Sequence, residues 1–382
     1  MTKSLRHAAG SLLVVGLSGT ELTGLERAWL KLVRPAGIIL FRRNIADATQ
    51  TRTLLDAAAA LCASHPFRCV DVEGGTVDRL RDVLAPMPSA QAVAAAARQL
   101  GTTRLAREHG ELIARGVKAF GFNTTLAPVL DLALPDSAQV MGTRSAAADA
   151  AGVVAHAREF LAGLAAEGVA GCGKHFPGLG GGTRDSHVET PAIERAWKDL
   201  WREDMAPYRE LRNELKMVMV NHAAYPATRG KGLPASASPF WITTVLRKRI
   251  GYRGLIFSDD MEMGGILKFL PMEEAAVAAV RAGMDTLEIC HSPELILRAF
   301  EALIAESERS VAFRTLLINR AGEAGRKRTR LFAAGTTKAL TERQFEALRA
   351  RILRFQEDVT GKPESESTPV QYAKSASLVE TE

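Results

Sequence analysis

The sequence predicts an α/β protein, a (β/α)8 barrel of the TIM type that forms a single domain. Eight short apolar runs alternate with longer amphipathic segments over about 300 residues, the usual size of such a barrel. The runs are mostly continuous Val, Ile, Leu or Met, as expected for parallel strands that are buried on both faces. An open doubly wound sheet is the main alternative, but Gly16-Leu17-Ser18-Gly19-Thr20 does not match its Gly-rich first turn.

The expected elements follow from these runs and from the helix signals between them. Asp47 suits the N-cap of the first clear helix, and Pro239 suits the first turn of a later one. The expected strands are Leu12–Gly16, Gly37–Phe41, Arg68–Val72, Phe120–Leu130, Val169–Gly173, Met217–Asn221, Gly254–Ser258 and Asp285–Cys290. The expected helices are Asp47–Ala63, Gln91–Arg115, Ala146–Glu167, Ile193–Leu215, Phe240–Ile250 and Glu273–Ala282.

The two ends of the chain differ in character. Met1–Leu17 resembles a weak signal peptide, but no small-x-small cleavage site follows it, so we favour a buried first strand over export. We assign residues 1–357 to the barrel and residues 358–382, which are polar, to a disordered tail.

Composition narrows the classes of partner. No apolar run reaches the ~18 residues of a membrane span, so we expect none. The four cysteines are scattered without a CxxC pattern, which favours reduced, buried thiols in a cytoplasmic protein. The net charge is +6, and much of the excess lies near Arg326–Arg330. No aromatic residues interleave these charges, so we interpret them as a solvated helix end and expect no nucleic-acid partner. The oligomeric state is not indicated.

Polar residues repeatedly follow the apolar runs. Because the active sites of barrels lie at the carboxyl ends of the strands, this pattern predicts a shared polar pocket. The residues concerned are Arg43, Asn44, Asp71, Glu73, Asp131, Lys174, His175, Asn221, His222, Asp259, Asp260 and His291.

Three kinds of chemistry could use such a pocket. Metal-assisted hydrolysis is disfavoured, because neither HxH nor HExxH occurs. Glycoside hydrolysis needs one carboxylate beside the sugar and a proton donor opposite it. Asp259 directly follows an apolar strand and suits the first role. Because the side chains of neighbouring strand residues point to opposite faces, Asp260 should point away from the pocket, and we expect it to be structural. A non-catalytic barrel that binds sugar or peptide is the third alternative.

The stretch Lys174–His187 is glycine-rich and ends with Asp185 two residues before His187. An imidazole can donate and accept protons near neutral pH, and a neighbouring carboxylate can orient it. We therefore expect a catalytic loop whose strand end, Lys174-His175, binds substrate.

Five ordered motifs resemble those of glycoside hydrolase family 3, in particular its single-domain NagZ-type β-N-acetylglucosaminidases. The resemblance runs from Gly37 through His291. The segments are 71–79 (D-x-E-G-G-R-V-x-R), 123–131 (N-x-x-L-A-P-V-x-D), 141–145 (I-G-x-R-S), 174–187 (K-H-F-P-G-H-G-x-x-x-x-D-S-H) and 257–260 (F-S-D-D).

This resemblance implies a (β/α)8 catalytic barrel and retaining removal of a terminal β-linked N-acetylglucosamine, often from cell-wall muropeptides. Asp259 would be the nucleophile, and His187 with Asp185 the acid/base dyad. The residues implied to hold the sugar are Asp71, Arg79, Arg144, Lys174 and His175. No metal or organic cofactor is implied. A phosphorylase, a β-glycosidase for another sugar and a sugar-binding barrel stay open as alternatives.

Three positions depart from the family pattern. Leu179 replaces the usual histidine of P-G-H-G, Gly181 stands where an aspartate is common, and Thr76 replaces an arginine. They leave substrate specificity open. Glu73 and Asp131 are evenly balanced between site and structural roles, and for His291 we favour a core histidine.

Overall fold

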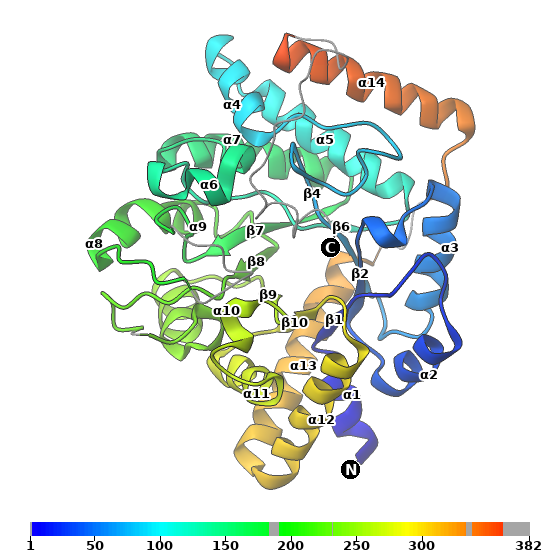
Figure 1. Ribbon diagram of the computed structural model, residues 1–382, viewed down its shortest axis with the longest axis vertical. Helices are drawn as coiled ribbons and strands as arrows, with labels where there is room; N and C mark the ends of the chain where they lie inside the picture. Colours follow the sequence, from blue (N-terminus) through cyan, green and yellow to red (C-terminus); the bar gives the residue numbers. More distant parts are fainter. Residues whose placement is uncertain (1, 183–190, 231, 334–337, 362–382) are drawn as a thin grey trace.

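The computed structural model describes residues 2–182, 191–230, 232–333 and 338–361. Its centre is a closed barrel of eight parallel strands in the order β1-β10-β9-β8-β7-β6-β3-β2, surrounded by helices (Figure 1). The predicted fold class is therefore confirmed.

Each of the eight strands lies within or beside an expected apolar run. They are β1 (Leu13–Val15), β2 (Gly37–Leu40), β3 (Phe67–Val70), β6 (Thr124–Thr125), β7 (Ala170–Phe176), β8 (Met217–Val220), β9 (Leu255–Asp260) and β10 (Thr286–Ile289). The expected strand Phe120–Leu130 is wrong in extent, because Phe120 caps the preceding helix and only Thr124–Thr125 form a regular strand between β3 and β7, with one further isolated bridge from Val129 to Lys174. Its other apolar residues are buried without belonging to a strand.

The helices surround the barrel in chain order. They are α1 (Thr2–Gly10), α2 (Gly24–Val33), α3 (Ala48–Ala59), α4 (Ala90–Gln99), α5 (Arg104–Ala119), α6 (Ala138–Met141), α7 (Ala150–Ala166), α8 (Trp197–Asp199), α9 (Ala206–Glu210), α10 (Gly264–Leu267), α11 (Met272–Ala282), α12 (Pro293–Arg309), α13 (Val311–Leu331) and α14 (Glu342–Thr360). Two π-helical segments, η4 (Leu200–Asp204) and η6 (Phe240–Arg249), lie within the predicted helices Ile193–Leu215 and Phe240–Ile250.

Two predicted helices are divided in the structure. The segment Gln91–Arg115 breaks at Gly101, whose φ of 62° a helix cannot contain, and gives α4 and α5. The segment Ile193–Leu215 gives α8, η4 and α9, because Pro207 lacks the N–H that a continuous helix would need and instead lies in the first turn of α9.

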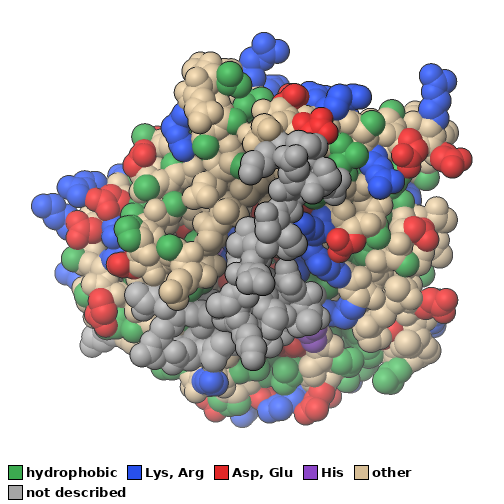
Figure 2. Space-filling view, turned by 45° about the horizontal axis from the view of Figure 1, so that its top comes forward, with side chains coloured by type: hydrophobic (Ala, Val, Ile, Leu, Met, Phe, Trp, Pro, Cys, Tyr) green, Lys and Arg blue, Asp and Glu red, His purple; other side chains and the backbone are tan. Residues whose placement is uncertain are grey.

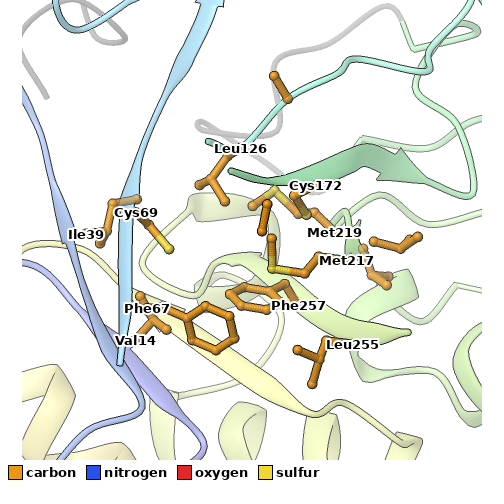
Figure 3. Packing of buried hydrophobic residues seen from close by; sticks show 14 of the residues in the cluster. Val14, Ile39, Phe67, Cys69, Leu126, Cys172, Met217, Met219, Leu255 and Phe257 are labelled. Carbon is orange, nitrogen blue, oxygen red and sulfur yellow. The ribbon is translucent and has the colours of Figure 1, made fainter. Parts of the chain in front are cut away.

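The barrel interior is filled by large apolar side chains from different strands. Phe67 of β3 and Phe257 of β9 meet edge to face with ring centroids 4.9 Å apart (Figure 3). Both are almost fully buried. Aromatic pairs in this geometry add about 0.5–1.5 kcal/mol beyond the area that they bury. This layer closes the interior below the carboxyl ends of the strands.

The first strand lies in the core, as we expected for the apolar part of Met1–Leu17. Val14 pairs with Glu288 of β10 and with Gly37 of β2, so β1 closes the barrel. The four cysteines are also buried and free, in agreement with the sequence.

The basic run at the end of α13 is not simply a solvated helix end. Arg328 is buried, and its guanidinium donates hydrogen bonds to the carbonyl oxygens of Ser11 and Ser64. Arg328 therefore links α13 to the segments that precede β1 and β3. On the face shown in Figure 2, basic and acidic side chains are both spread around the edge of the molecule.

The C-terminal helix α14 packs against α4 and α5 (Figure 1). It ends at Thr360, so it continues past the predicted domain boundary at residue 357. The remainder of the predicted tail, residues 362–382, lies outside the described residues. Within the described part of the chain, no helix has the length and apolar character needed to cross a membrane.

Candidate active site

One pocket at the carboxyl ends of the strands collects most of the predicted site residues. We call it the strand-end pocket. It is lined by six residues predicted from the sequence, namely Asp71, Arg79, Arg144, Lys174, His175 and Asp259. The predicted acid/base residues Asp185 and His187 lie outside the described residues.

A buried ionic network holds one wall of this pocket. Lys174 Nζ lies 2.7 Å from Asp71 Oδ1 and 2.6 Å from Glu73 Oε1. Arg144 donates two hydrogen bonds of 2.8 Å to the two oxygens of Glu73. The sequence left open whether Glu73 belongs to the site or is structural. In the structure it is the carboxylate that both cations share. The network fixes the positions of Lys174 and Arg144 before any ligand arrives.

The charges in this network stabilise one another. Burial would raise the pKa of Glu73, but Arg144 and Lys174 outweigh it and hold that pKa well below its usual range. Burial would likewise lower the pKa of Lys174, and the carboxylates of Asp71 and Glu73 instead raise it. Glu73 and Lys174 are therefore both ionised at neutral pH.

The Gly74-Gly75 bend places Glu73 in the network. It joins β4 (Val72–Gly74) to β5 (Val77–Asp78), and both glycines have positive φ, 91° and 66°. A Cβ on Gly74 would lie 2.2 Å from the carbonyl oxygen of Pro88. The close neighbour of this bend is therefore the protein's own backbone.

Asp131 positions the histidine of the strand end. Its Oδ2 accepts hydrogen bonds from the backbone N of His175, at 3.1 Å, and lies 2.6 Å from His175 Nδ1. Its Oδ1 accepts from the backbone N of Leu179, at 2.7 Å. The other ring nitrogen, Nε2, lies 3.3 Å from Arg144 Nη2. The sequence also left open whether Asp131 belongs to the site or is structural. In the structure it orients His175, which lines the pocket.

A second wall contains Arg79 and an aromatic side chain. The guanidinium carbon of Arg79 lies 5.6 Å from the ring centroid of Phe41. The His291 ring lies 5.3 Å from the same centroid. Because His291 lines the pocket, its interpretation as a core histidine is wrong. His222 is instead the satisfied core histidine, bonded to Ser236 Oγ and to the carbonyl oxygen of Asp260.

Asp259 and Asp260 both line the pocket, although strand alternation predicted that only one would. The reason is a register shift between β9 and β10. Phe257 pairs with Thr286, and Asp260 pairs with Glu288, so β9 holds one extra residue over this stretch. Such a bulge redirects side chains at the end of a strand. The expectation that strand alternation would keep Asp260 out of the pocket is therefore wrong.

Asp260 belongs to a small polar group beside the nucleophile candidate. Burial, and then the nearby charge of Glu262, raise the pKa of Asp260 to about 7. The imidazole of His291 lies 3.3 Å from Glu262 and 3.7 Å from Asp260. In the described part of the chain these three residues bring possible metal-ligand atoms within 4.8 Å of one another.

One charged residue of the pocket was not predicted from the sequence. Glu288 of β10 lines the strand-end pocket and is only 2% exposed. It lies inside the apolar run Asp285–Cys290, which was interpreted only as a strand. A carboxylate in the middle of a buried run was the available signal.

Comparison with known proteins identifies the family of this chain. Residues 4–313 match the family description "Glycosyl hydrolase family 3 N terminal domain". The chain belongs to glycoside hydrolase family 3. It is a glycoside hydrolase, and it is 35% identical to a protein named Beta-hexosaminidase of Stenotrophomonas maltophilia (strain R551-3) over 80% of this chain and 91% of the relative. A Beta-hexosaminidase of Alkalilimnicola ehrlichii is 39% identical over 74% of this chain and 82% of the relative.

Solved structures agree in fold. The β-N-acetylglucosaminidase of glycoside hydrolase family 3 from Paenibacillus sp. str. FPU-7 has a TM-score of 0.81 and 32% identity, covering 92% of this chain and 68% of that one. NagZ from Neisseria gonorrhoeae has a TM-score of 0.69 and 30% identity, covering 82% and 98%.

The structure shows what surrounds two of the positions that depart from the family pattern, Leu179 and Gly181. Leu179 lines the strand-end pocket, so an apolar side chain forms part of its wall. A Cβ on Gly181 would lie 2.4 Å from Cδ of Arg195, which is paired with Glu203 and Asp204. An aspartate at position 181 would therefore have to displace this arginine.

Proposed function

We propose that this enzyme is a retaining exo-β-N-acetylglucosaminidase that removes terminal β-linked N-acetylglucosamine, with muropeptide fragments of peptidoglycan as its natural substrates. The observation that carries the proposal is the position of Asp259, at the carboxyl end of the buried strand β9, in one pocket with Lys174 and Arg144. Relatives named Beta-hexosaminidase support the choice of sugar.

Asp259 would attack the anomeric carbon and form a covalent glycosyl-enzyme, while the glycosidic oxygen takes a proton and leaves. His187, oriented by Asp185, would supply that proton and then remove one from the incoming water. These two residues lie outside the described part of the chain, so their roles rest on the motif alone.

The rest of the pocket would hold the sugar. Lys174 has three N–H groups and uses two on Asp71 and Glu73, which leaves one for a sugar hydroxyl. Asp71 can accept a second hydrogen bond through its remaining oxygen. Arg79, Arg144 and His175 would complete the donors. Because the ionic network positions these groups in advance, little ordering is needed when the sugar binds.

We further propose that the barrel, together with α14, acts as one catalytic domain without a metal or organic cofactor. A cytoplasmic location stays a prediction from the scattered, unpaired cysteines. The oligomeric state is left open.

A panel of aryl β-glycosides, with the product anomers followed by NMR, tests the proposal. We expect turnover of the N-acetyl-β-glucosaminide with the β-anomer formed first. Formation of the α-anomer first, or preference for another sugar, would contradict it. Sugar 1-phosphate in phosphate buffer would identify a phosphorylase, and no turnover of any substrate would leave only the sugar-binding barrel.

The role of His187 needs its own comparison. A proton donor matters most when the leaving group is poor. His187→Ala should therefore impair hydrolysis of a natural disaccharide much more than that of an activated aryl glycoside. Equal losses on both substrates would show that His187 is not the acid.

A further inference from the structure

Glu288 is a buried carboxylic side chain without a complete set of protein partners. It lies in the middle of β10, between Leu287 and Ile289, and is 2% exposed. Its Oε1 is buried and has no hydrogen-bond partner among the described residues. An unsatisfied buried polar group is destabilising, so an apolar residue here would make a more stable barrel.

The same side chain faces the strand-end pocket. It lines that pocket together with Asp259 and Asp71. Its strand partner across the bulge is Asp260, which lines the pocket as well. A polar group that is unsatisfied in the protein and directed into a binding pocket has the arrangement expected of a ligand contact.

The groups around Glu288 come from β3, β7 and β9 and from the end of β10 itself. They are Asp71 after β3, Lys174 in β7, Asp259 and Asp260 in β9, and the thiols of Cys69, Cys172 and Cys290. Burial, and then the charges of Asp71, Asp260 and Asp259, raise the pKa of Glu288 well above its ordinary value. Lys174 opposes this shift, but its ammonium is already bound to Asp71 and Glu73.

We propose that Glu288 is a specificity-determining residue of this pocket, whose side-chain carboxyl group hydrogen-bonds a hydroxyl group of the bound sugar. In its protonated form the carboxyl group offers one O–H donor and one carbonyl acceptor. A sugar hydroxyl also offers a donor and an acceptor, so the two groups are complementary. The inference rests on the proposed function, since it takes the ligand to be a sugar.

Three variants separate this role from a structural one. Glu288→Gln keeps a neutral donor and acceptor, and Glu288→Met keeps the length of the side chain without its polarity. Thr286→Val is the matched control, because residues two apart in a strand point to the same side. Thr286 is 1% exposed and does not line the pocket.

With p-nitrophenyl N-acetyl-β-glucosaminide as substrate, Glu288→Met should lower kcat/KM by about tenfold or more, mainly through KM. Glu288→Gln should lose much less at pH 6, and Thr286→Val should stay within about twofold of the wild type. As the pH rises through the range in which Glu288 ionises, the wild type should lose activity more steeply than Glu288→Gln, because ionised Glu288 has no proton to donate. Glu288→Met should melt at or above the temperature of the wild type.

Deoxy substrates identify the hydroxyl. One of the 3-, 4- or 6-deoxy analogues should lose kcat/KM in the wild type by about the same factor as Glu288→Met loses on the parent sugar. Glu288→Met should then lose nothing further on that analogue, as in a double-mutant cycle.

A wild-type KM for Glu288→Met would overturn the proposal. A lower melting temperature with unchanged kcat/KM would also overturn it and would make Glu288 structural. Preference of the wild type for the free-amine glucosaminide would overturn it in favour of an ionised Glu288 that binds an ammonium group.

Failure of the proposed function would be seen separately, as absence of turnover by the wild type. Calorimetric titration with N-acetylglucosamine would then test Glu288 by itself. Weaker binding to Glu288→Met than to Thr286→Val would support the contact, and equal binding would overturn it.

Discussion

Replacing Glu73 by Gln tests whether the buried ionic network organises the pocket. The substitution keeps the shape of the side chain and removes the charge that Lys174 and Arg144 share. The side chains of Glu73 and Lys174 are only 3% and 4% exposed, so water cannot replace that charge. Removing one partner of a buried ion pair costs about 3–5 kcal/mol, and we expect a loss of unfolding free energy in this range.

The same substitution should reduce activity. Lys174 and Arg144 would lose a shared anchor, and misplacement of binding groups by a fraction of an ångström is costly. We expect kcat/KM on an aryl N-acetyl-β-glucosaminide to fall about 100-fold, which corresponds to about 2.7 kcal/mol of transition-state binding. Urea denaturation at constant pH would measure stability, and initial rates would measure kcat/KM.

Glu273→Gln is the matched control for this prediction. Glu273 also accepts two hydrogen bonds from one arginine, Arg298, at 2.7 and 3.0 Å, but both side chains are 41% exposed. Exposed pairs contribute little, so we expect no measurable change in stability or activity. If Glu73→Gln behaved like Glu273→Gln, the network could not be what positions Lys174 and Arg144.

Three further predictions concern other parts of the barrel. Asp131→Asn places an amide N–H opposite a backbone N–H of His175 or Leu179, and kinetic assays should show kcat/KM lowered about 10- to 100-fold; an unchanged kcat/KM would contradict the positioning role. Phe67→Ala removes the edge-to-face contact with Phe257 and should cost about 3–5 kcal/mol in urea denaturation, with less than 1 kcal/mol contradicting its place in the core. Glu288 has a raised pKa, so the folded state binds a proton that the unfolded state releases above the ordinary value of 4.5, and the wild type loses stability as pH rises from there. Glu288→Gln should therefore gain in melting temperature relative to the wild type as pH rises above 4.5, whereas a constant difference would show that Glu288 is ionised in the fold.

Most of the strands were predictable from the sequence because they lie in continuous apolar runs. Leu13–Val15 and Met217–Val220 are examples, and their burial follows from composition alone. The segment Phe120–Leu130 failed because apolar residues in a loop can be buried as completely as those in a strand. Only pairing with β3 and β7 distinguishes the two cases, and pairing is not a local property.

The predicted site residues came together because strand ends converge at one end of a barrel. The sequence could not show that Asp260 also lines the pocket, since this depends on a bulge between β9 and β10. It also could not show that Glu73 and Asp131 orient Lys174, Arg144 and His175, because those contacts join residues far apart in the chain. The Glu inside the apolar run of β10, Glu288, could have been noticed in the sequence, and it lines the pocket.

The most direct test of the central claim is to trap the glycosyl-enzyme on Asp259. A fluorinated N-acetylglucosaminyl fluoride that slows hydrolysis of the intermediate should label the wild type once, and mass spectrometry of the digested protein should find the label on the peptide that contains Asp259. Asp259→Asn should not be labelled. A label on Asp260, Glu288 or any other carboxylate, or inversion at the anomeric carbon, would contradict the account.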